Sequence, residues 1–400
     1  MIKELIKDYK GLPREIYILF ISRVINRIGA FVYPLLTLIL TDKIGIPKDR
    51  AGTFITLLVI LSAPGMFIGG KLVDIIGRKK VLVIFNSLGA IVLFMCGFWK
   101  HNMTMVYILA LSSIFFSFSM ASQDAMVADI TTPKDRKKAF SLLYMGNNLG
   151  LSIGPIIAGL LYKNYLSLIF IGDAITTLIS MALVLIYVEE TFDKGKISAK
   201  ERELEREEKG SVVSILSKRP IIVYYALILF FYNLGYSQWG FGLPLHVKDM
   251  FGDVGPKYYG FLSAFNGFIV ITMTPIVSKL TDKLNSLKAM AFGGFLYFIS
   301  LFMLSFINNL PLLFVSTGIL TIGEIIVIID SVTFVANNSP ASHRGRLNSF
   351  VMAIYGAGMA VGPFVMGKLL IFYNINIVWI IVSVVVLVAA SLMRMLVKFQ

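Results

Sequence analysis

The sequence predicts an all-α membrane protein with twelve transmembrane helices, arranged as two similar bundles of six. Three observations predict this class: a mean hydropathy of +0.80, a charged fraction of only 15%, and long uncharged stretches that recur through the 400 residues. About 20 consecutive apolar residues cross the hydrocarbon core of a bilayer as a helix. The predicted spans cover residues 14–41, 51–75, 80–99, 103–130, 139–162, 164–188, 219–247, 257–280, 287–308, 310–337, 347–371 and 376–397.

The positive charges are distributed asymmetrically among the predicted loops. With the N-terminus inside, 27 of the 37 lysines and arginines fall in inner segments and 8 in outer loops, while Arg23 and Arg27 lie within helix 1. Because cytoplasmic loops carry the excess of Lys and Arg, we expect a multi-pass protein of the cell (inner) membrane with cytoplasmic N- and C-termini. The net charge of +14 is then an orientation signal, and we expect no nucleic-acid partner.

A polar segment divides the spans six and six. Residues 189–219 contain EETFDKGKISAKERELEREEKG, which is too polar to cross a bilayer and has the Glu, Lys and Arg content of a cytoplasmic helical linker. The predicted organisation is therefore an N-terminal six-helix bundle over 1–188, the linker over 189–219 and a C-terminal six-helix bundle over 220–400. The first residues lack a small-residue cleavage site after a short apolar core, so we expect no removable signal peptide.

The two halves repeat each other at a constant offset of 208 residues. Single coincidences are common in membrane sequences, but one offset across three inter-helix regions indicates duplication of a six-helix unit. Such duplication is typical of transporters whose halves rock about a central site. The matched residues are Lys71, Asp74, Val127, Arg136, Ser141, Gly150, Gly154, Pro155 and Gly159, which recur as Lys279, Asp282, Val335, Arg344, Ser349, Gly358, Gly362, Pro363 and Gly367.

Two motifs resemble those of a known family. Residues 70–80, GKLVDIIGRKK, match the loop signature GxLaDrxGrkxxl of the major facilitator superfamily at nearly every position. Gly146, Gly150 and Gly154-Pro155, with Gly159 following, resemble the helix 5 signature of its drug:proton antiporter branch, the multidrug efflux transporters. The resemblance covers essentially the whole chain. It implies the major facilitator fold, alternating access and proton-coupled antiport.

These motifs contain the residues that we expect to act in gating. Gly77 lets a short turn adopt a conformation barred to other residues. Asp74 can pair with an arginine or face a helix N-terminus, whose partial positive charge favours a carboxylate. In the family such contacts lock the halves together on the cytoplasmic side, and Asp129 matches a position that joins them. The predicted switch residues are Gly70, Asp74, Gly77, Arg78, Asp129, Gly154 and Pro155; the alternatives are a topology signal for the loop and plain packing for helix 5.

Two arginines inside helix 1 require partners. Arg23 and Arg27 lie one turn apart on one face, and a charge at bilayer depth costs at least about 2.5–3.5 kcal/mol. Arginine cannot lose its proton, so each needs a partner or water. Counting about 1.5 Å per residue, Asp124 of helix 4 lies at the depth of Arg23. We expect the two to pair, which would keep Asp124 ionised.

Glu324 has a different setting, near the middle of helix 10 with no cation adjacent in the sequence. Desolvation favours the neutral form of a carboxyl group, and a proton carrier needs both forms. The stretch Gly318–Ile326 also resembles helix 10 of a multidrug/proton antiporter branch with a proton-coupled glutamate at this point. Its alternatives are a pair with Arg27 or a hydrogen bond to helix 11. The predicted proton-coupling residues are Glu324, with Asp330 and Asp124 as further candidates.

Polar and aromatic residues within the spans predict a substrate cavity of mixed character. The alternative for such side chains is a hydrogen bond between helices or a place at the membrane interface. The predicted lining is Arg23, Asn26, Arg27, Tyr33, Gln123, Tyr144, Asn147, Tyr236, Trp239 and Tyr355.

The leading functional interpretation is a proton-driven secondary active exporter of amphipathic small molecules. The alternative is a dedicated carrier of one physiological solute, such as a sugar, lipid or organic anion, in either direction. A membrane enzyme or channel is disfavoured because the sequence has no GxxxxGK[ST] loop and no HExxH helix. A single cysteine, Cys96, excludes a disulfide framework and a cysteine-cluster metal site. We expect a monomer in membrane lipid with no catalytic residue, metal or cofactor, and with protons and a small-molecule substrate as its partners.

Overall fold

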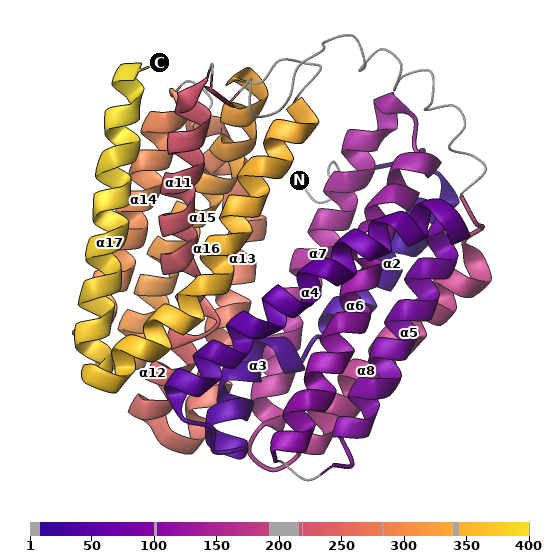
Figure 1. Ribbon diagram of the computed structural model, residues 1–400, viewed down its shortest axis with the longest axis horizontal. Coiled ribbons are helices and arrows are strands. Elements are labelled where there is room, and N and C mark those ends of the chain that lie inside the picture. The colour runs from indigo at the N-terminus through magenta and orange to yellow at the C-terminus, as the bar shows by residue number, and fades with distance from the viewer. Residues whose placement is uncertain are drawn as a thin grey trace. The chain divides into compact units, whose positions relative to one another are not determined.

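The computed structural model describes residues 9–99, 102–191, 216–217, 219–281, 284–338 and 344–399, and every regular element within them is a helix (Figure 1). Before the linker the helices are α2 (Arg14–Ile28), α3 (Val32–Leu38), the π-helical turn η1 (Ile39–Lys43), α4 (Lys48–Ile76), α5 (Arg78–Cys96), α6 (Met103–Ile130), α7 (Pro133–Leu161) and α8 (Leu166–Tyr187). After it they are α11 (Pro220–Tyr236), η3 (Ser237–Trp239), α12 (Gly242–Phe251), η4 (Gly252–Val254), α13 (Gly255–Thr281), α14 (Ser286–Leu304), α15 (Leu310–Asn338), α16 (Arg344–Phe372), α17 (Ile375–Leu396) and η6 (Val397–Phe399).

The helices have the lengths and compositions of membrane spans. Ten segments of the described chain are long and apolar enough to cross a bilayer. One of them, Pro220–Thr281, contains two successive predicted spans, α11–α12 and α13. A further helix, α7, is 29 residues long but carries a charged first turn and a glycine- and asparagine-rich middle, and it is not among the ten. With that segment divided and α7 included, the helices correspond to the twelve predicted spans.

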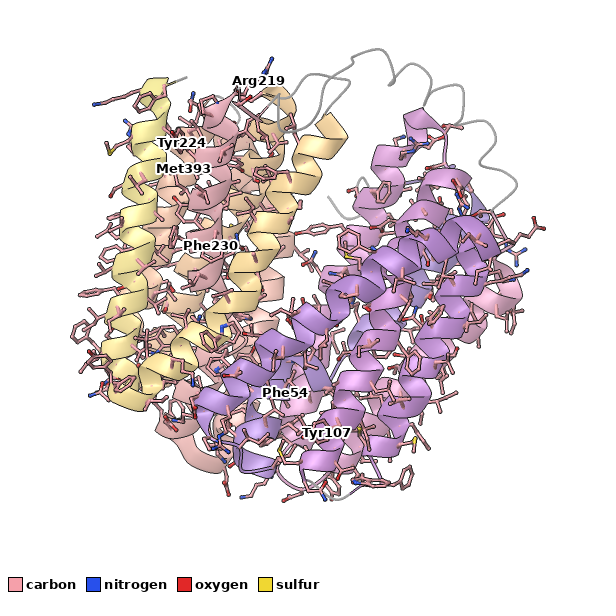
Figure 2. The ribbon with its side chains drawn as sticks, in the orientation of Figure 1. Phe54, Tyr107, Arg219, Tyr224, Phe230 and Met393 are labelled. Carbon is pink, nitrogen blue, oxygen red and sulfur yellow. The ribbon has the colours of Figure 1, made fainter. Side chains whose placement is uncertain are left out.

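Large apolar side chains lie on the outer surfaces of the helices. Tyr107 on α6 is 65% exposed and Tyr224 on α11 is 57% exposed (Figure 2). Soluble monomers rarely expose extended apolar patches, whereas lipid tails accept them. Helices also satisfy their backbone hydrogen bonds internally, which the bilayer core demands. This surface is the one expected for a helical membrane protein.

The chain divides into two compact units. Unit 1 comprises Met1–Gly45, Leu57–Ile197 and Asp253–Gly267, and unit 2 comprises Ile46–Thr56, Ser198–Gly252 and Phe268–Gln400. Both α4 and α13 are therefore divided between the units. The first part of α4 belongs to unit 2, and the first part of α13 belongs to unit 1.

In unit 1, small residues bring helix backbones close together. A Cβ atom built on Gly154 of α7 would lie 2.9 Å from the carbonyl oxygen of Ile28 on α2, and one on Gly150 would overlap Arg27. On the first part of α13, a Cβ atom on Gly260 would overlap the carbonyl oxygen of Pro155. The glycine face of α7 is thus a packing surface for α2, as small residues at four-residue spacing allow.

Unit 2 repeats these contacts. A Cβ atom on Gly358 of α16 would overlap the carbonyl oxygen of Phe230 on α11, and one on Gly52 of α4 would overlap the carbonyl oxygen of Pro363. Around the start of α4, Lys48 Nζ lies 2.8 Å from Asp249 Oδ2. The contact between Gly52 and Pro363 and the contact between Gly260 and Pro155 are related at both ends by the same 208 residues that relate the sequence motifs.

Candidate functional site

A cavity of about 740 Å³ lies within unit 1. This volume is in the range of small-molecule pockets. Its wall mixes aromatic and thioether side chains, among them Phe116 and Met120, with the polar residues of five helices. Of the predicted cavity residues, it contains Arg23, Asn26, Arg27, Tyr33, Gln123, Tyr144 and Asn147, together with Asp124.

Arg23 on α2 is held by two residues of α6. Its Nη2 and Nε atoms donate to Gln123 Oε1 at 2.7 and 3.1 Å, and Nη2 lies 3.4 Å from Asp124 Oδ1. The Asp124 side chain is 63% exposed, so it faces the open cavity while it neutralises Arg23. The contact from Arg23 to the Gln123 amide oxygen is shorter than its contact to Asp124. Gln123 thus occupies the Nε/Nη2 edge of the guanidinium. The expected Arg23–Asp124 contact is present, and the sequence analysis did not assign Gln123 to it.

Asp173 on α8 is a charged cavity residue that the sequence analysis did not single out. Helix 1, predicted as one continuous span, ends as α2 at Ile28 and restarts as α3 at Val32. Asp173 Oδ2 accepts hydrogen bonds from the backbone N–H groups of Phe31 and Val32, at 3.1 and 3.2 Å. These are orphan donors of a helix start, and a carboxylate is stabilising there. The sequence did contain a signal for Asp173, because it is an acidic residue inside the apolar run 164–188.

Arg27 lies beside this break and faces the cavity. It interacts electrostatically with Arg23, Asp173 and Tyr33. Its side chain is exposed to the cavity, and the Tyr33 side chain next to it is 76% exposed. Asn26, on the same helix, instead donates to Thr177 on α8 at 3.0 Å, which makes it an interhelical contact as well as a lining residue.

Glu324 lies in unit 2 among tyrosines. The Tyr236 hydroxyl of α11 is hydrogen-bonded to the Glu324 carboxyl group on α15. Tyr297 on α14 is also within electrostatic range of this group, and the rings of Tyr236 and Tyr297 stack with centroids 5.9 Å apart. Tyr355 on α16 interacts electrostatically with both of these tyrosines. The cluster of Glu324 and the three tyrosines therefore draws on four helices. Tyr297 was not among the predicted residues.

Two other predicted residues of unit 2, Asp330 and Trp239, are enclosed by neighbouring helices. Asp330 is 4% exposed and accepts hydrogen bonds from Thr281 at the end of α13 and Ser286 at the start of α14. Trp239 lines a cavity of only about 10 Å³ together with Trp379, which is room for about one water molecule.

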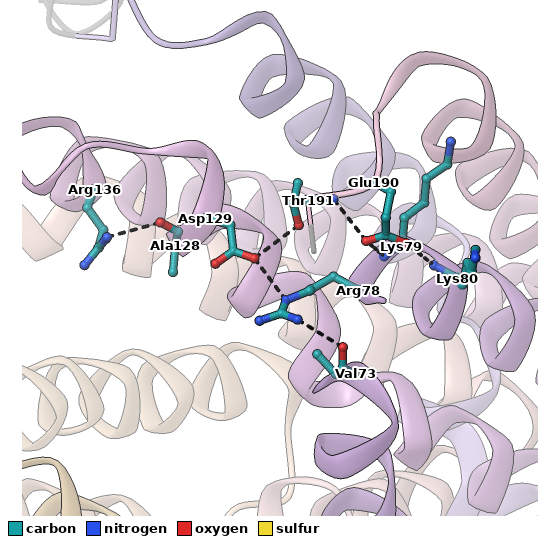
Figure 3. A network of polar contacts seen from close by, with 9 residues as sticks. All are labelled: Val73, Arg78, Lys79, Lys80, Ala128, Asp129, Arg136, Glu190 and Thr191. Atoms are coloured by element: carbon teal, nitrogen blue, oxygen red, sulfur yellow. Dashed lines mark hydrogen bonds and ion pairs between the residues drawn. The ribbon is translucent and has the colours of Figure 1, made fainter. Parts of the chain in front are cut away.

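The turn between α4 and α5 contains a buried ion pair. Arg78 Nε lies 3.0 Å from Asp129 Oδ2 at the end of α6, and both side chains are almost fully buried (Figure 3). The Arg78 guanidinium also donates to the Val73 carbonyl at 3.1 Å, and Thr191 Oγ1 donates to Asp129 at 3.2 Å. The side chain of Asp74 lies outside the part of the chain that the structure describes.

The carboxylate at the start of α5 is Glu190, which follows α8. Its Oε1 and Oε2 atoms accept from the backbone N–H groups of Lys79 and Lys80, both at 3.2 Å (Figure 3). Gly77 has φ 106°, a conformation that favours glycine, and the Glu190 carboxylate packs against its Cα atom. Partial burial raises the pKa of Glu190, but the backbone hydrogen bonds outweigh it and hold the pKa below its ordinary value. Gly70 has open space around its Cα atom.

Among the described residues, no group of three His, Cys, Asp or Glu side chains could hold a metal ion. The sequence model of the Major Facilitator Superfamily matches residues 19–328 and 251–399 of this chain. The chain belongs to the Major Facilitator Superfamily.

Relatives within the superfamily are similar along nearly the whole chain. The uncharacterised MFS-type transporter YttB of Bacillus subtilis is 28% identical over 95% of this chain and 94% of its own length. A Na⁺, Li⁺, K⁺/H⁺ antiporter of Planococcus maritimus is 22% identical, covering 83% of this chain and 84% of its own. The multidrug resistance protein MdtG of Proteus mirabilis is 24% identical, covering 88% and 87%. These relatives are transporters, so this member of the Major Facilitator Superfamily is a transporter and not an enzyme.

Solved structures confirm the predicted fold. A POT family transporter, crystallised in complex with a thioalcohol-conjugated peptide, superimposes with a TM-score of 0.81 at 13% identity, covering 98% of this chain and 97% of that one. The prediction of an all-α major facilitator fold with twelve transmembrane helices is confirmed. Superfamily members bind small-molecule substrates, and the cavity of unit 1 has the size for one.

Proposed function

We propose that the protein is a proton-coupled secondary active transporter that exports amphipathic small molecules by alternating access, with Glu324 as its proton-carrying residue. The observation that carries this proposal is the tyrosine-lined carboxyl group of α15. Glu324 is hydrogen-bonded to Tyr236 and lies in electrostatic range of Tyr297, and Tyr355 interacts with both of these tyrosines.

Hydroxyl partners suit a group that must change its protonation state. A tyrosine hydroxyl can donate to an ionised carboxylate and can accept from a carboxylic acid. Both forms of Glu324 can therefore keep a hydrogen bond during the cycle. Asp124 is arranged differently, since the Arg23 guanidinium lies 3.4 Å away and would lose its counter-charge if the carboxyl group were neutral. Of the predicted carboxyl groups, Glu324 is thus the best suited to proton exchange.

Export of amphipathic compounds is supported by the mixed cavity wall and by the multidrug resistance relative. A cycle that takes in one proton gains ~2.3 kcal/mol per 100 mV, which corresponds to roughly a fifty-fold gradient. The proposal includes a location in the cell membrane with both termini in the cytoplasm, supported by the asymmetric distribution of Lys and Arg. It also includes a monomer whose gating residues are the predicted ones of the α4–α5 region and α7, together with Asp129 at the end of α6.

A second candidate is monovalent cation/proton antiport, because one relative carries that name. A cation exchanger would need no amphipathic cavity, and Glu324 would bind the cation and the proton in turn. The two candidates predict different substrates for one energy source, so a single transport assay separates them.

The test uses purified protein in proteoliposomes with an imposed pH gradient. Wild type is expected to accumulate an amphipathic dye when the gradient is imposed, and Na⁺, Li⁺ or K⁺ should not collapse that gradient. The Glu324→Gln variant mimics the protonated form, so it should exchange dye across the membrane but fail to concentrate it. Uphill dye transport by Glu324→Gln would reject Glu324 as the coupling residue. Gradient collapse by monovalent cations without dye transport would favour the second candidate.

A matched control is Asp124→Asn, which also neutralises a carboxylate within a span. Because this variant removes the counter-charge of Arg23, we expect a lower thermal stability while uphill transport by the folded fraction continues. Loss of coupling without loss of stability in Asp124→Asn would move the proton site to unit 1.

A further inference from the structure

The charges that line the cavity of unit 1 sum to zero, but they are not equally neutralised. Arg23 is engaged by Gln123 and Asp124. Asp173 is engaged by the backbone N–H groups of Phe31 and Val32 at the start of α3. The sequence alone left the charge of the cavity undecided, because it does not show which of these groups meet.

Among the described residues, Arg27 is the cationic group of the cavity that has no hydrogen-bonded partner, and Asp173 interacts with it only electrostatically. Within the part of the chain that the structure describes, its guanidinium makes no hydrogen bond and no ion pair, and it is exposed to the cavity. Its backbone is held in place, because Gly150 and Gly154 of α7 pack directly against Arg27 and Ile28. Five N–H donors in a fixed fork are therefore presented to the cavity from a rigid helix.

We propose that this cavity binds organic anions, with the anionic group of the substrate on Arg27 and its apolar part against the aromatic wall. Carboxylate, sulfonate and phosphonate groups match the guanidinium fork. Phe116, Phe140 and Met120 line the same cavity and supply the surface for the apolar part. Tyr33 and Tyr144, which are 76% and 50% exposed, add two amphipathic rings to the same cavity, and Tyr33 lies next to Arg27.

The inference rests on the proposed transport function and narrows its substrate class. It also predicts the charge moved in each cycle. A cycle that exports a neutral compound for one proton moves one positive charge inward. A cycle that exports a monovalent anion for one proton moves two, so the membrane potential drives it twice as strongly.

Binding is measured first, without any gradient, on purified protein with two probes of the same shape: naphthoate, which is anionic, and naphthamide, which is neutral. Naphthoate should bind wild type more tightly than naphthamide. In Arg27→Gln the naphthoate affinity should fall about 10- to 100-fold, the cost of one charge-assisted interaction, and naphthamide affinity should stay the same. Arg27→Lys should keep part of the naphthoate affinity because it keeps the charge.

The matched control is Arg394→Gln on α17, an exposed residue that removes the same charge far from the cavity along the chain. It should leave both affinities unchanged. Equal binding of naphthoate and naphthamide to wild type, or an undiminished naphthoate affinity in Arg27→Gln, would overturn the anion site. If Arg27→Gln does not fold, the comparison of the two probes on wild type still decides the question.

Transport separates this inference from the function on which it rests. In proteoliposomes, naphthoate transport should move about twice the charge per molecule that naphthamide transport moves. Gradient-driven transport of both probes with equal charge movement would contradict the anion site and leave the proposed function standing. Selective naphthoate binding without any gradient-driven transport would reject the proposed function and leave the anion site standing.

Discussion

Gly52 on α4 lies directly against the carbonyl oxygen of Pro363 on α16, and their repeat equivalents Gly260 and Pro155 make the same contact between α13 and α7. Both glycines are 208 residues apart, as are both prolines. The internal duplication seen in the sequence is thus present as a duplicated backbone contact, once in each unit. Each contact joins the first part of α4 or α13 to a proline-containing helix.

Replacing these glycines should destabilise the protein. Gly52→Ala and Gly260→Ala each place a methyl group on a backbone oxygen, and overpacking of this kind costs about 1–3 kcal/mol. We expect a lower melting temperature for both variants in a thermal unfolding assay. The control is Gly356→Ala on α16, where a Cβ atom meets nothing within 4 Å. An unchanged melting temperature in Gly52→Ala would show that α4 and α16 can move apart at little cost, which would contradict the prediction.

Glu190→Gln should weaken the junction between α8 and α5. The variant removes the negative charge at the start of α5, and because Glu190 is partly exposed we expect a loss of about 0.5–1 kcal/mol. The pKa of Glu190 in the folded protein lies below its unfolded value, so its contribution is present above the unfolded pKa and is lost as pH falls through the folded pKa. The melting temperatures of wild type and variant should therefore converge in acid. A gap that widened on acidification would contradict this assignment.

Asp129→Asn should be more severe, because it leaves the Arg78 guanidinium buried beside a neutral side chain. Removing one partner of a buried ion pair costs about 3–5 kcal/mol. The remaining bond from Arg78 to the Val73 carbonyl places the expected loss at the lower end. The melting temperature of Arg78→Gln/Asp129→Asn should exceed that of Asp129→Asn, since no charge is left stranded. A double variant as unstable as the sum of the single variants would show that the two residues act independently.

Asp74→Asn should affect transport more than stability. The sequence motif predicts that Asp74 forms a contact in only one conformation of the cycle, so its loss should slow substrate transport while the protein remains folded in the membrane. Transport rate and melting temperature, measured on the same preparation, test this. Normal transport by Asp74→Asn would reduce the motif to a topology signal.

Cysteine labelling checks the predicted orientation. Cys96 is buried and should give little background. Cysteines introduced at Lys43 and Lys257 should react with an impermeant reagent added outside cells, whereas one at Lys200 in the linker should react only after lysis. Labelling of the Lys200 position from outside would reverse the predicted topology.

Several parts of the site could be predicted from sequence, and others could not. Intramembrane charges are conspicuous, so Arg23, Asp124 and Glu324 were found by depth and composition. Asp173 and Glu190 were not, although both are acidic residues at or near helix 6. Their roles depend on a helix start elsewhere in the chain: the break in helix 1 for Asp173 and the start of α5 for Glu190. Hydropathy locates a helix along the chain but does not show which of its faces meets which neighbour.

The sequence by itself determined the class of protein, the approximate spans and the internal repeat, because a bilayer admits only segments that satisfy their own backbone hydrogen bonds. Only the tertiary structure decided how the charges are paired. Arg23 and Arg27 are one turn apart and are the same residue type. Yet Arg23 donates to Gln123 and pairs with Asp124, whereas Arg27 faces the cavity. This difference arises because electrostatic partners are set by distances of a few ångströms between helices, which packing alone determines.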